Sequence, residues 1–333
     1  MPIDPAGLFA PAASVCELSL VIPAFNEAGV LGDAVAAVAR SAAEVTADYE
    51  ILVVDDGSSD ATWPAVTAAH EADARVCGLR LSRNFGKDAA LSAGIEHSRG
   101  RAVVVLDADL QHPPALIPEL YRAWKRGAEI VNGIKRDRTK EPLTRRVMSR
   151  LFHMAASRLT GLDFNNSSDY KLLDRRVVNA WLALPERRSF FRGMVAWLGF
   201  RTEDIYFDVA PRAGGGGSKY GVWRLARMAW LAASSYSVAP LHIIHFLSAT
   251  FLSVGVVLGA RAFYQKLTGQ AIGGFTTVII LELLMGGFIL LSLGIIAEYL
   301  AAIYEETKRR PRYIVSESLP AGYRGTSAPE AHS

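Results

Sequence analysis

The chain has 333 residues, a formal net charge of +3 and a hydrophobic content of 50%. This length allows one or two domains, and the small net charge excludes a strongly basic nucleic-acid-binding protein. The mean hydropathy of +0.18 is high for a soluble protein, and the apolar excess lies after residue 238. Cys16 and Cys77 lack the spacing of a metal site or a disulfide framework, which favours free thiols in a reducing compartment.

Residues 1–17 carry neither a basic amino-terminal region nor a long apolar run, so we expect a disordered leader and not a signal peptide. Strands and helices then alternate. Strands are expected at 18–22, 49–54, 76–81, 103–106 and 130–132, and helices at 29–45, 61–72, 88–98 and 115–126. This alternation predicts an α/β domain over 18–215, built on a doubly wound, mostly parallel sheet.

The expected strand at 103–106 ends in two carboxylates, Asp107 and Asp109, followed by Gln111 and a double proline. In an open α/β sheet, ligands bind outside the carboxyl ends of the strands. Two carboxylates placed there repel each other unless a cation lies between them. Carboxylate and amide oxygens suit Mg²⁺ or Mn²⁺, which in turn bind phosphate oxygens. A solvated Asp-x-Asp loop is the alternative, and the position behind a buried strand favours the metal site.

Two common phosphate-binding motifs are absent from the sequence. No Gly-x-Gly-x-x-Gly follows the first expected strand, and the glycine run at 214–217 leads into Ser218 and Lys219, which is the wrong order for a P-loop. We interpret this run as a flexible loop that closes over a ligand.

A basic cluster follows the expected sheet. Its members are Lys135, Arg136, Arg138, Lys140, Arg145, Arg146 and Arg150. The cluster is either a solvated helix face or a surface that meets anionic lipid headgroups and a phosphorylated substrate. Its place ahead of an apolar region favours the second interpretation.

Two apolar stretches, 241–260 and 275–302, are each long enough to cross a bilayer. They predict a two-helix transmembrane hairpin at 239–303, an interfacial helical segment at 216–238, and a cytoplasmic tail at 304–333 that is disordered after Ser316. Lysine and arginine are concentrated outside the hairpin loop, which places the α/β domain and both termini in the cytoplasm. The Gly255-x-x-x-Gly259 spacing is either incidental or a close helix contact, within the chain or in a homo-oligomer.

Four motifs occur in the order seen in inverting glycosyltransferases of family 2, and the chain resembles that family. They are Pro-Ala-Phe-Asn-Glu at 23–27, Val-Asp-Asp-Gly-Ser-Ser-Asp at 54–60, Arg-Asn-Phe-Gly-Lys at 83–87 and Asp-Ala-Asp-Leu-Gln at 107–111. Segments at 169–173, 212–220 and 298–311 narrow the resemblance to the polyisoprenyl-phosphate glycosyltransferases, which include undecaprenyl-phosphate glucosyltransferases and dolichyl-phosphate mannose synthase. The resemblance covers about residues 18 to 315.

The resemblance implies a set of site residues. The nucleotide-sugar donor would be bound by Pro23, Phe25, Glu27, Val54, Asp56, Asp107, Ala108 and Asp109, with Arg212 and Lys219 closing over it. The metal would be held by Asp107, Asp109 and Gln111, and the acceptor phosphate by Lys135, Arg145 and Ser149. The catalytic residues would be Asp109, Asp169 and Arg145. Asp169 is expected to orient the acceptor or the sugar; a catalytic base and a structural salt bridge are the alternatives.

The implied reaction is inverting transfer of a sugar to a polyprenyl phosphate at the cell inner membrane, for cell-envelope glycan modification. Mg²⁺ or Mn²⁺ is the expected cofactor, UDP-glucose the expected donor and GDP-mannose the alternative. The acceptor phosphate is already ionised at neutral pH because its second pKa is about 6, so no strong base is required. A processive polysaccharide synthase would carry a Gln-x-x-Arg-Trp signature and further spans, and a non-catalytic scaffold would not require Asp56, Asp107 and Asp109 together.

Overall fold

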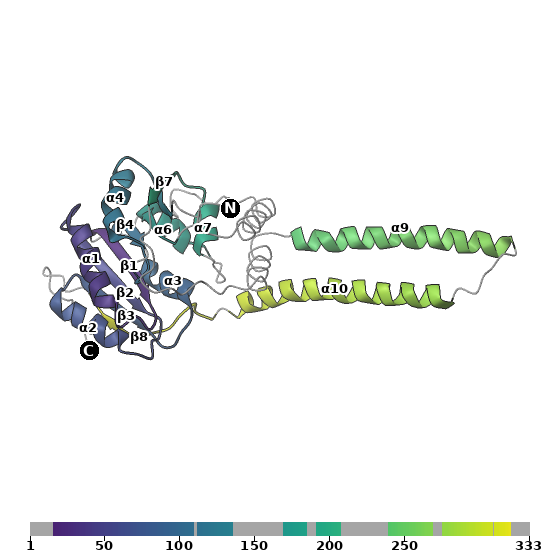
Figure 1. The fold of residues 1–333 in the computed structure, drawn as a ribbon, viewed down its shortest axis with the longest axis horizontal. Helices are drawn as coiled ribbons and strands as arrows, with labels where there is room; N and C mark the ends of the chain where they lie inside the picture. Colours follow the sequence, from purple (N-terminus) through teal and green to yellow (C-terminus); the bar gives the residue numbers. More distant parts are fainter. Residues whose placement is uncertain are drawn as a thin grey trace, which may run out of the picture. The chain divides into compact units, whose positions relative to one another are not determined.

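The computed structural model describes residues 16–109, 112–135, 169–184, 191–207, 239–268, 275–308 and 310–320. The chain divides into two compact units (Figure 1). The first, which we call the sheet unit, comprises Met1–His153, Leu162–Gly217 and Arg310–Ser333. The second, the helical unit, comprises Met154–Gly161 and Ser218–Arg309.

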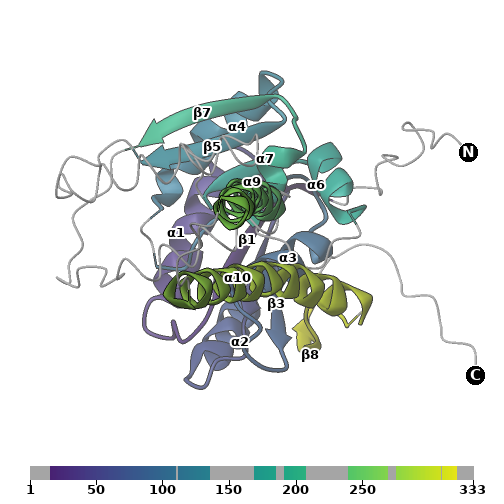
Figure 2. The ribbon, with the colours of Figure 1, turned by 90° about the vertical axis from the view of Figure 1, so that its right-hand side faces the viewer.

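The sheet unit is built on a sheet whose strands follow the order β7-β5-β6-β4-β1-β2-β3-β8, with β7 and β8 at opposite edges (Figure 2). The strands are β1 Cys16–Ala24, β2 Tyr49–Asp55, β3 Val76–Leu81, β4 Gly100–Val105, β5 Ile130–Lys135, β6 Lys171–Asp174, β7 Thr202–Phe207 and β8 Val315–Leu319. β4, β1, β2 and β3 are parallel neighbours, whereas β6 is antiparallel to β4 and β5. The prediction of a mostly parallel α/β sheet is confirmed.

Helices cover both faces of this sheet, which explains why the central strands β1 and β2 are buried along almost their whole length. The helices are α1 Leu31–Ala43, α2 Thr62–Ala72, α3 Lys87–His97, the 3₁₀ turn η1 Pro114–Leu116, α4 Ile117–Lys125, α6 Arg175–Leu182 and α7 Phe191–Trp197. Side chains of α1, α2 and α4 share the larger apolar core with alternate residues of the strands, and α3 packs in a smaller cluster with the intervening residues. A Cβ at Gly94 of α3 would lie 2.2 Å from Val21 Cγ1, so glycine is what allows α3 to approach β1 this closely.

Three strands, β6, β7 and β8, were not anticipated by the sequence pattern. β6 has four residues, which is too short for a period to be recognised. β8 lies in the tail, and the expectation that residues beyond Ser316 are disordered is therefore wrong for 317–319. β8 pairs antiparallel with β3 at the edge of the sheet, so the segment after the last helix is part of the sheet unit.

The described part of the helical unit contains two long helices, α9 Ala239–Leu267 and α10 Phe275–Thr307. Both apolar stretches of the sequence are therefore helical. The two helices pack together, and the rings of Phe251 and Phe288 are 5.1 Å apart. Within the described residues, one segment, Leu284–Thr307 of α10, is long and apolar enough to cross a membrane, with 24 residues and a mean hydropathy of 1.9. The second span and the orientation stay predictions, and the segment at 216–238 lies outside the described residues.

Candidate active site

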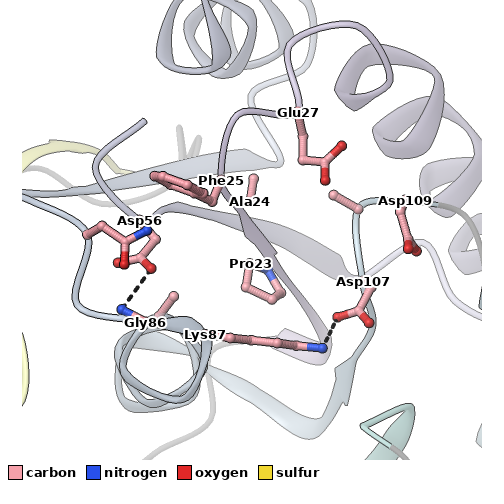
Figure 3. A pocket seen from close by; sticks show the side chains of 12 residues that line it. Pro23, Ala24, Phe25, Glu27, Asp56, Gly86, Lys87, Asp107 and Asp109 are labelled. Atoms are coloured by element: carbon pink, nitrogen blue, oxygen red, sulfur yellow. Dashed lines mark hydrogen bonds and ion pairs between the residues drawn. The ribbon is translucent and has the colours of Figure 1, made fainter. Parts of the chain in front are cut away.

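A cavity of about 290 Å³ lies where β1, β2 and β4 end (Figure 3). It is lined by Pro23, Ala24, Phe25, Glu27, Asp56, Asn84, Gly86, Lys87, Ala90, Asp107, Ala108 and Asp109. The three strands are adjacent and parallel, so the loops that follow them meet at one edge of the sheet.

Seven residues that the resemblance assigned to the donor site line this cavity, namely Pro23, Phe25, Glu27, Asp56, Asp107, Ala108 and Asp109. Val54 is not among the lining residues. It is fully buried in the apolar cluster that also holds Ala90, so its place is in the support of the cavity wall. Gln111, Arg145, Ser149, Arg212 and Lys219 lie outside the described residues. Lys135 is exposed at the end of β5 and does not line the cavity.

Asp56 organises one end of the cavity. Its carboxylate accepts the backbone N–H groups of Phe85 at 2.8 Å and of Gly86 at 2.9 Å. Gly86 has a φ of 98°, which a residue with a Cβ rarely adopts, so this glycine permits the turn into α3. Burial raises the pKa of Asp56, although the two N–H donors oppose the shift. Phe25, 44% exposed, lies at the same end of the cavity and offers an apolar face beside the carboxylate (Figure 3).

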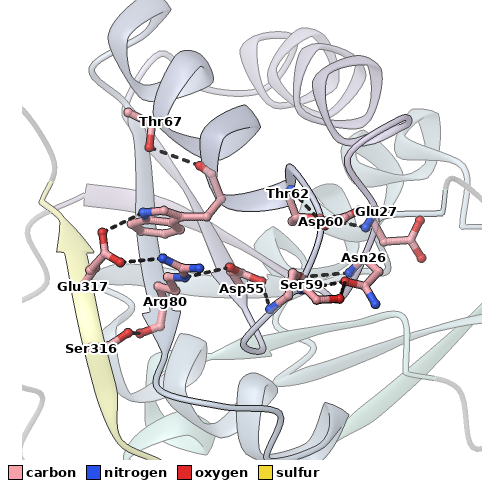
Figure 4. Close-up of polar contacts among 12 residues, drawn as sticks. Asn26, Glu27, Asp55, Ser59, Asp60, Thr62, Thr67, Arg80, Ser316 and Glu317 are labelled. Atoms are coloured by element: carbon pink, nitrogen blue, oxygen red, sulfur yellow. Dashed lines mark hydrogen bonds and ion pairs between the residues drawn. The ribbon is translucent and has the colours of Figure 1, made fainter.

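A polar network ties the loop after β1 to the loop after β2 (Figure 4). The Asn26 N–H donates to Ser58 Oγ at 2.9 Å, and the Ser59 N–H donates to Asn26 Oδ1 at 2.9 Å. Asn26 has a positive φ of 55°. The Glu27 N–H donates in turn to Thr62 Oγ1. Neither Asn26 nor its partners were assigned a role from the sequence, although they lie within its motifs; they hold Phe25 and Glu27 at the cavity.

Lys87 links two carboxylates at the other end of the cavity. Its Nζ lies 2.6 Å from Asp107 Oδ1 and 2.8 Å from Asp169 Oδ2. Lys87 ends the Arg-Asn-Phe-Gly-Lys motif, and the resemblance gives it no role in the site. A sequence signal for it existed, because Lys87 follows the glycine that ends the loop before α3.

The antiparallel strand β6 brings Asp169 to this point. Val105 of β4 pairs with Lys171 of β6, and continuing the same register by two residues sets Asp107 opposite Asp169. Asp169 is 8% exposed and Tyr170 is fully buried, with the Tyr170 hydroxyl donating to the Pro113 carbonyl at 3.1 Å. Asp169 is therefore held by a packed strand end and not by a free loop.

The donor atoms present fit a hard divalent cation. Asp107 and Asp109 present carboxylates to the cavity, and Mg²⁺ is commonly bound by one or two carboxylates together with substrate phosphates. Burial raises the pKa of Glu27, and Asp109, Asp60 and Asp107 raise it further, which shows an excess of negative charge on this side. Among the described residues no group of three or more acidic, histidine or cysteine side chains forms a complete metal cage.

Residues 19–182, which contain every residue lining the cavity, match the family model described as glycosyl transferase family 2. An uncharacterized glycosyltransferase of Synechocystis is 37% identical over 303 residues, which are 90% of this chain and 95% of that protein. The chain belongs to glycosyltransferase family 2. This family 2 transferase is also 32% identical to the bactoprenol glucosyl transferase of Shigella phage SfII over 91% of this chain and 98% of that protein.

The resemblance to polyisoprenyl-phosphate glycosyltransferases is thereby confirmed, and the reaction class of the transferase is glycosyl transfer from a nucleotide sugar. Among solved structures, glucosyl-3-phosphoglycerate synthase from Mycobacterium tuberculosis, in complex with Mn²⁺, UDP and phosphoglyceric acid, is 19% identical. That match covers 69% of this chain and 80% of the other, with a TM-score of 0.45.

Proposed function

We propose that this transferase moves glucose from UDP-glucose to a polyprenyl phosphate, with inversion at the anomeric carbon. The observation that carries the proposal is the cavity itself. Asp56 and Phe25 lie at one end of the cavity, and Asp107 and Asp109 lie at the other. A nucleoside diphosphate likewise has its base at one end and its charged diphosphate at the other. The name of the phage relative supports glucose and the lipid acceptor.

In the proposed complex, Phe25 packs against the base and Asp56 accepts hydrogen bonds from it, while Pro23, Glu27 and Ala108 shape the cavity around the rest of the donor. Asp107, Asp109 and Gln111 would hold Mg²⁺ or Mn²⁺, and the bound cation would supply positive charge against the negative charge of the departing diphosphate. Arg212 and Lys219 close over the donor and exclude water from it.

The acceptor arrives as an ionised phosphate, so the residues around it position it and do not need to remove a proton. We assign that role to Lys135, Arg145 and Ser149. Asp169, held opposite Asp107, orients the sugar or the acceptor at the reacting carbon. A single displacement then forms the bond from acceptor oxygen to sugar while the bond to the diphosphate breaks.

The membrane is the proposed location of the lipid acceptor. Large apolar side chains of α9 and α10, such as Leu252, Val257 and Leu290, are more than 60% exposed within the helical unit. Apolar surface of this kind requires a lipid or protein cover. We propose that both helices span the inner membrane as a hairpin, with the transferase domain over 18–215 in the cytoplasm and the segment at 216–238 at the interface.

The test is transfer by the purified full-length protein in lipid nanodiscs. Radiolabelled UDP-glucose and undecaprenyl phosphate are incubated with Mg²⁺ or Mn²⁺, and the organic-phase product is examined by NMR. We expect a glucosyl phospholipid whose anomeric configuration is opposite to that of the donor. Transfer from GDP-mannose and not from UDP-glucose would overturn the donor assignment, and retention of configuration would overturn the single displacement.

A further inference from the structure

Lys87 occupies a position that the proposed roles leave unexplained. It is the first residue of α3, directly after Gly86, whose N–H is bound by Asp56. Its side chain crosses the cavity floor from the Asp56 end to the carboxylate end (Figure 3). The backbone of Lys87 is thus fixed by Asp56, which we propose binds the nucleobase. The Lys87 ammonium lies among the residues that we propose bind the diphosphate and the sugar.

The ammonium of Lys87 balances charge between two carboxylates that come from different strands. Asp107 follows β4 and Asp169 precedes β6, and the antiparallel register sets them opposite each other. Each carboxylate has an oxygen within 2.8 Å of Lys87 Nζ, so without this cation they would repel each other at close range. Burial by itself lowers the pKa of Lys87, but the charges of Asp107 and Asp169 outweigh it and the pKa is raised, so the ammonium form is secure at neutral pH.

We propose that Lys87 is a positioning residue that holds Asp169 next to the reacting sugar. When the donor binds, Lys87 releases Asp107, which then binds the divalent cation. The proposal rests on the proposed function for the identity of the cation and the sugar. Lys87 and the divalent cation would compete for the negative charge of Asp107, since Lys87 Nζ lies 2.6 Å from Asp107 Oδ1. Asp169 is more buried than Asp107, with side chains 11% and 24% exposed, so Asp169 is the partner that Lys87 retains.

Metal binding provides a test without sugar transfer. Mn²⁺ is titrated calorimetrically into the full-length protein in the absence of donor. Lys87→Met keeps an unbranched side chain of nearly the same length and removes its charge, so we expect Mn²⁺ to bind roughly tenfold more tightly because a competing cation has left Asp107. Lys87→Arg should bind Mn²⁺ within about twofold of the wild type. Arg83→Met is the matched control, since it removes a cation from the same loop whose guanidinium lies over the Phe85 ring, 4.1 Å from its centroid.

A double-mutant cycle on turnover tests the link to Asp169. If Lys87 acts through Asp169, then Lys87→Met combined with Asp169→Asn lowers kcat no further than the more damaging single change, and Lys87→Arg restores part of the activity. Losses that multiply would overturn the proposal, as would unchanged Mn²⁺ affinity in Lys87→Met with a normal melting temperature. Failure of the wild type to transfer sugar would refute the proposed function instead, since the Mn²⁺ titration is read without a donor.

Discussion

Glu317 of β8 forms an ion pair with Arg80 of β3, with 2.6 Å between Glu317 Oε1 and Arg80 Nη1. Arg80 also lies 3.5 Å from the buried carboxylate of Asp55, and Asp55 Oδ1 accepts the N–H of Ser58 in the loop after β2 (Figure 4). Glu317 follows α10 closely in the chain, and its Oε2 accepts a hydrogen bond from Trp63 Nε1. The segment after the last helix is therefore connected by three side chains to a loop that borders the candidate donor site.

This connection predicts that Glu317→Ala weakens donor binding from a distance. The variant should raise the KM for the nucleotide sugar roughly two- to fivefold, the range of an exposed ion pair, and leave kcat nearly unchanged. Steady-state kinetics at saturating lipid acceptor measure it. Ser318→Ala, an exposed neighbour on the same strand, is the control. A KM equal to that of the wild type would show that β8 and the loop are not coupled.

The same ion pair predicts a pH dependence. The hydrogen bond from Arg80 lowers the pKa of Glu317 in the folded protein. Because folding lowers this pKa, the ion pair contributes to the stability of the folded protein above the unfolded pKa of about 4.3. That contribution is lost as the pH falls through the folded pKa. The protection factors of the β8 amides, which correct for the intrinsic pH dependence of exchange, should therefore fall in acid more in the wild type than in Glu317→Gln. Identical acid profiles would argue against the ion pair.

Asp109→Asn should lower turnover roughly a hundredfold or more, because it removes a negative charge at the proposed metal while leaving β4, which ends at Val105 ahead of it, intact. Single-turnover transfer at saturating Mg²⁺ measures the effect. Asp33→Asn on α1 makes the same chemical change at an exposed site and should transfer normally. Full activity of Asp109→Asn, or of the wild type in excess EDTA, would remove the metal from the mechanism.

Arg145→Ala should impair catalysis with the lipid acceptor and leave binding of the nucleotide-sugar donor unchanged. A charged hydrogen bond to phosphate is worth about 1.5–3 kcal/mol, so kcat/KM for polyprenyl phosphate should fall roughly 10- to 150-fold. Calorimetric affinity for the nucleotide sugar should stay the same. Arg138→Ala, in the same basic cluster, should do less. If the donor affinity fell while the acceptor kinetics stayed normal, Arg145 would belong to the donor site.

The proposed orientation predicts which cysteines a membrane-impermeant maleimide can reach in whole cells. Thr268→Cys, at the end of α9, should be labelled from outside, and Ser327→Cys should be labelled only after lysis. The natural cysteines give a low background, because burial raises the pKa of Cys16 and of Cys77 to about 12. Labelling in the reverse pattern would show that the hairpin has the opposite orientation in the membrane.

The local sequence determined the alternation of strands and helices, the loops that carry Asp56, Asp107 and Asp109, and the two apolar helices. These features are readable because each depends on residues close together in the chain, such as a β-branched run that ends in polar residues. The family motifs added the donor-site residues, and the structure places seven of them around one cavity.

Only the tertiary structure decided which residues from distant parts of the chain lie next to each other. Asp169 comes to Asp107 through the antiparallel register of β6, a strand of four residues with no period to recognise. Lys87 bridges them because Gly86 and Asp56 fix where α3 begins. β8 joins β3 although the two lie more than 230 residues apart, as the Arg80–Glu317 hydrogen bond shows. Pairings of this kind depend on backbone hydrogen bonds between distant segments, and local composition does not encode them.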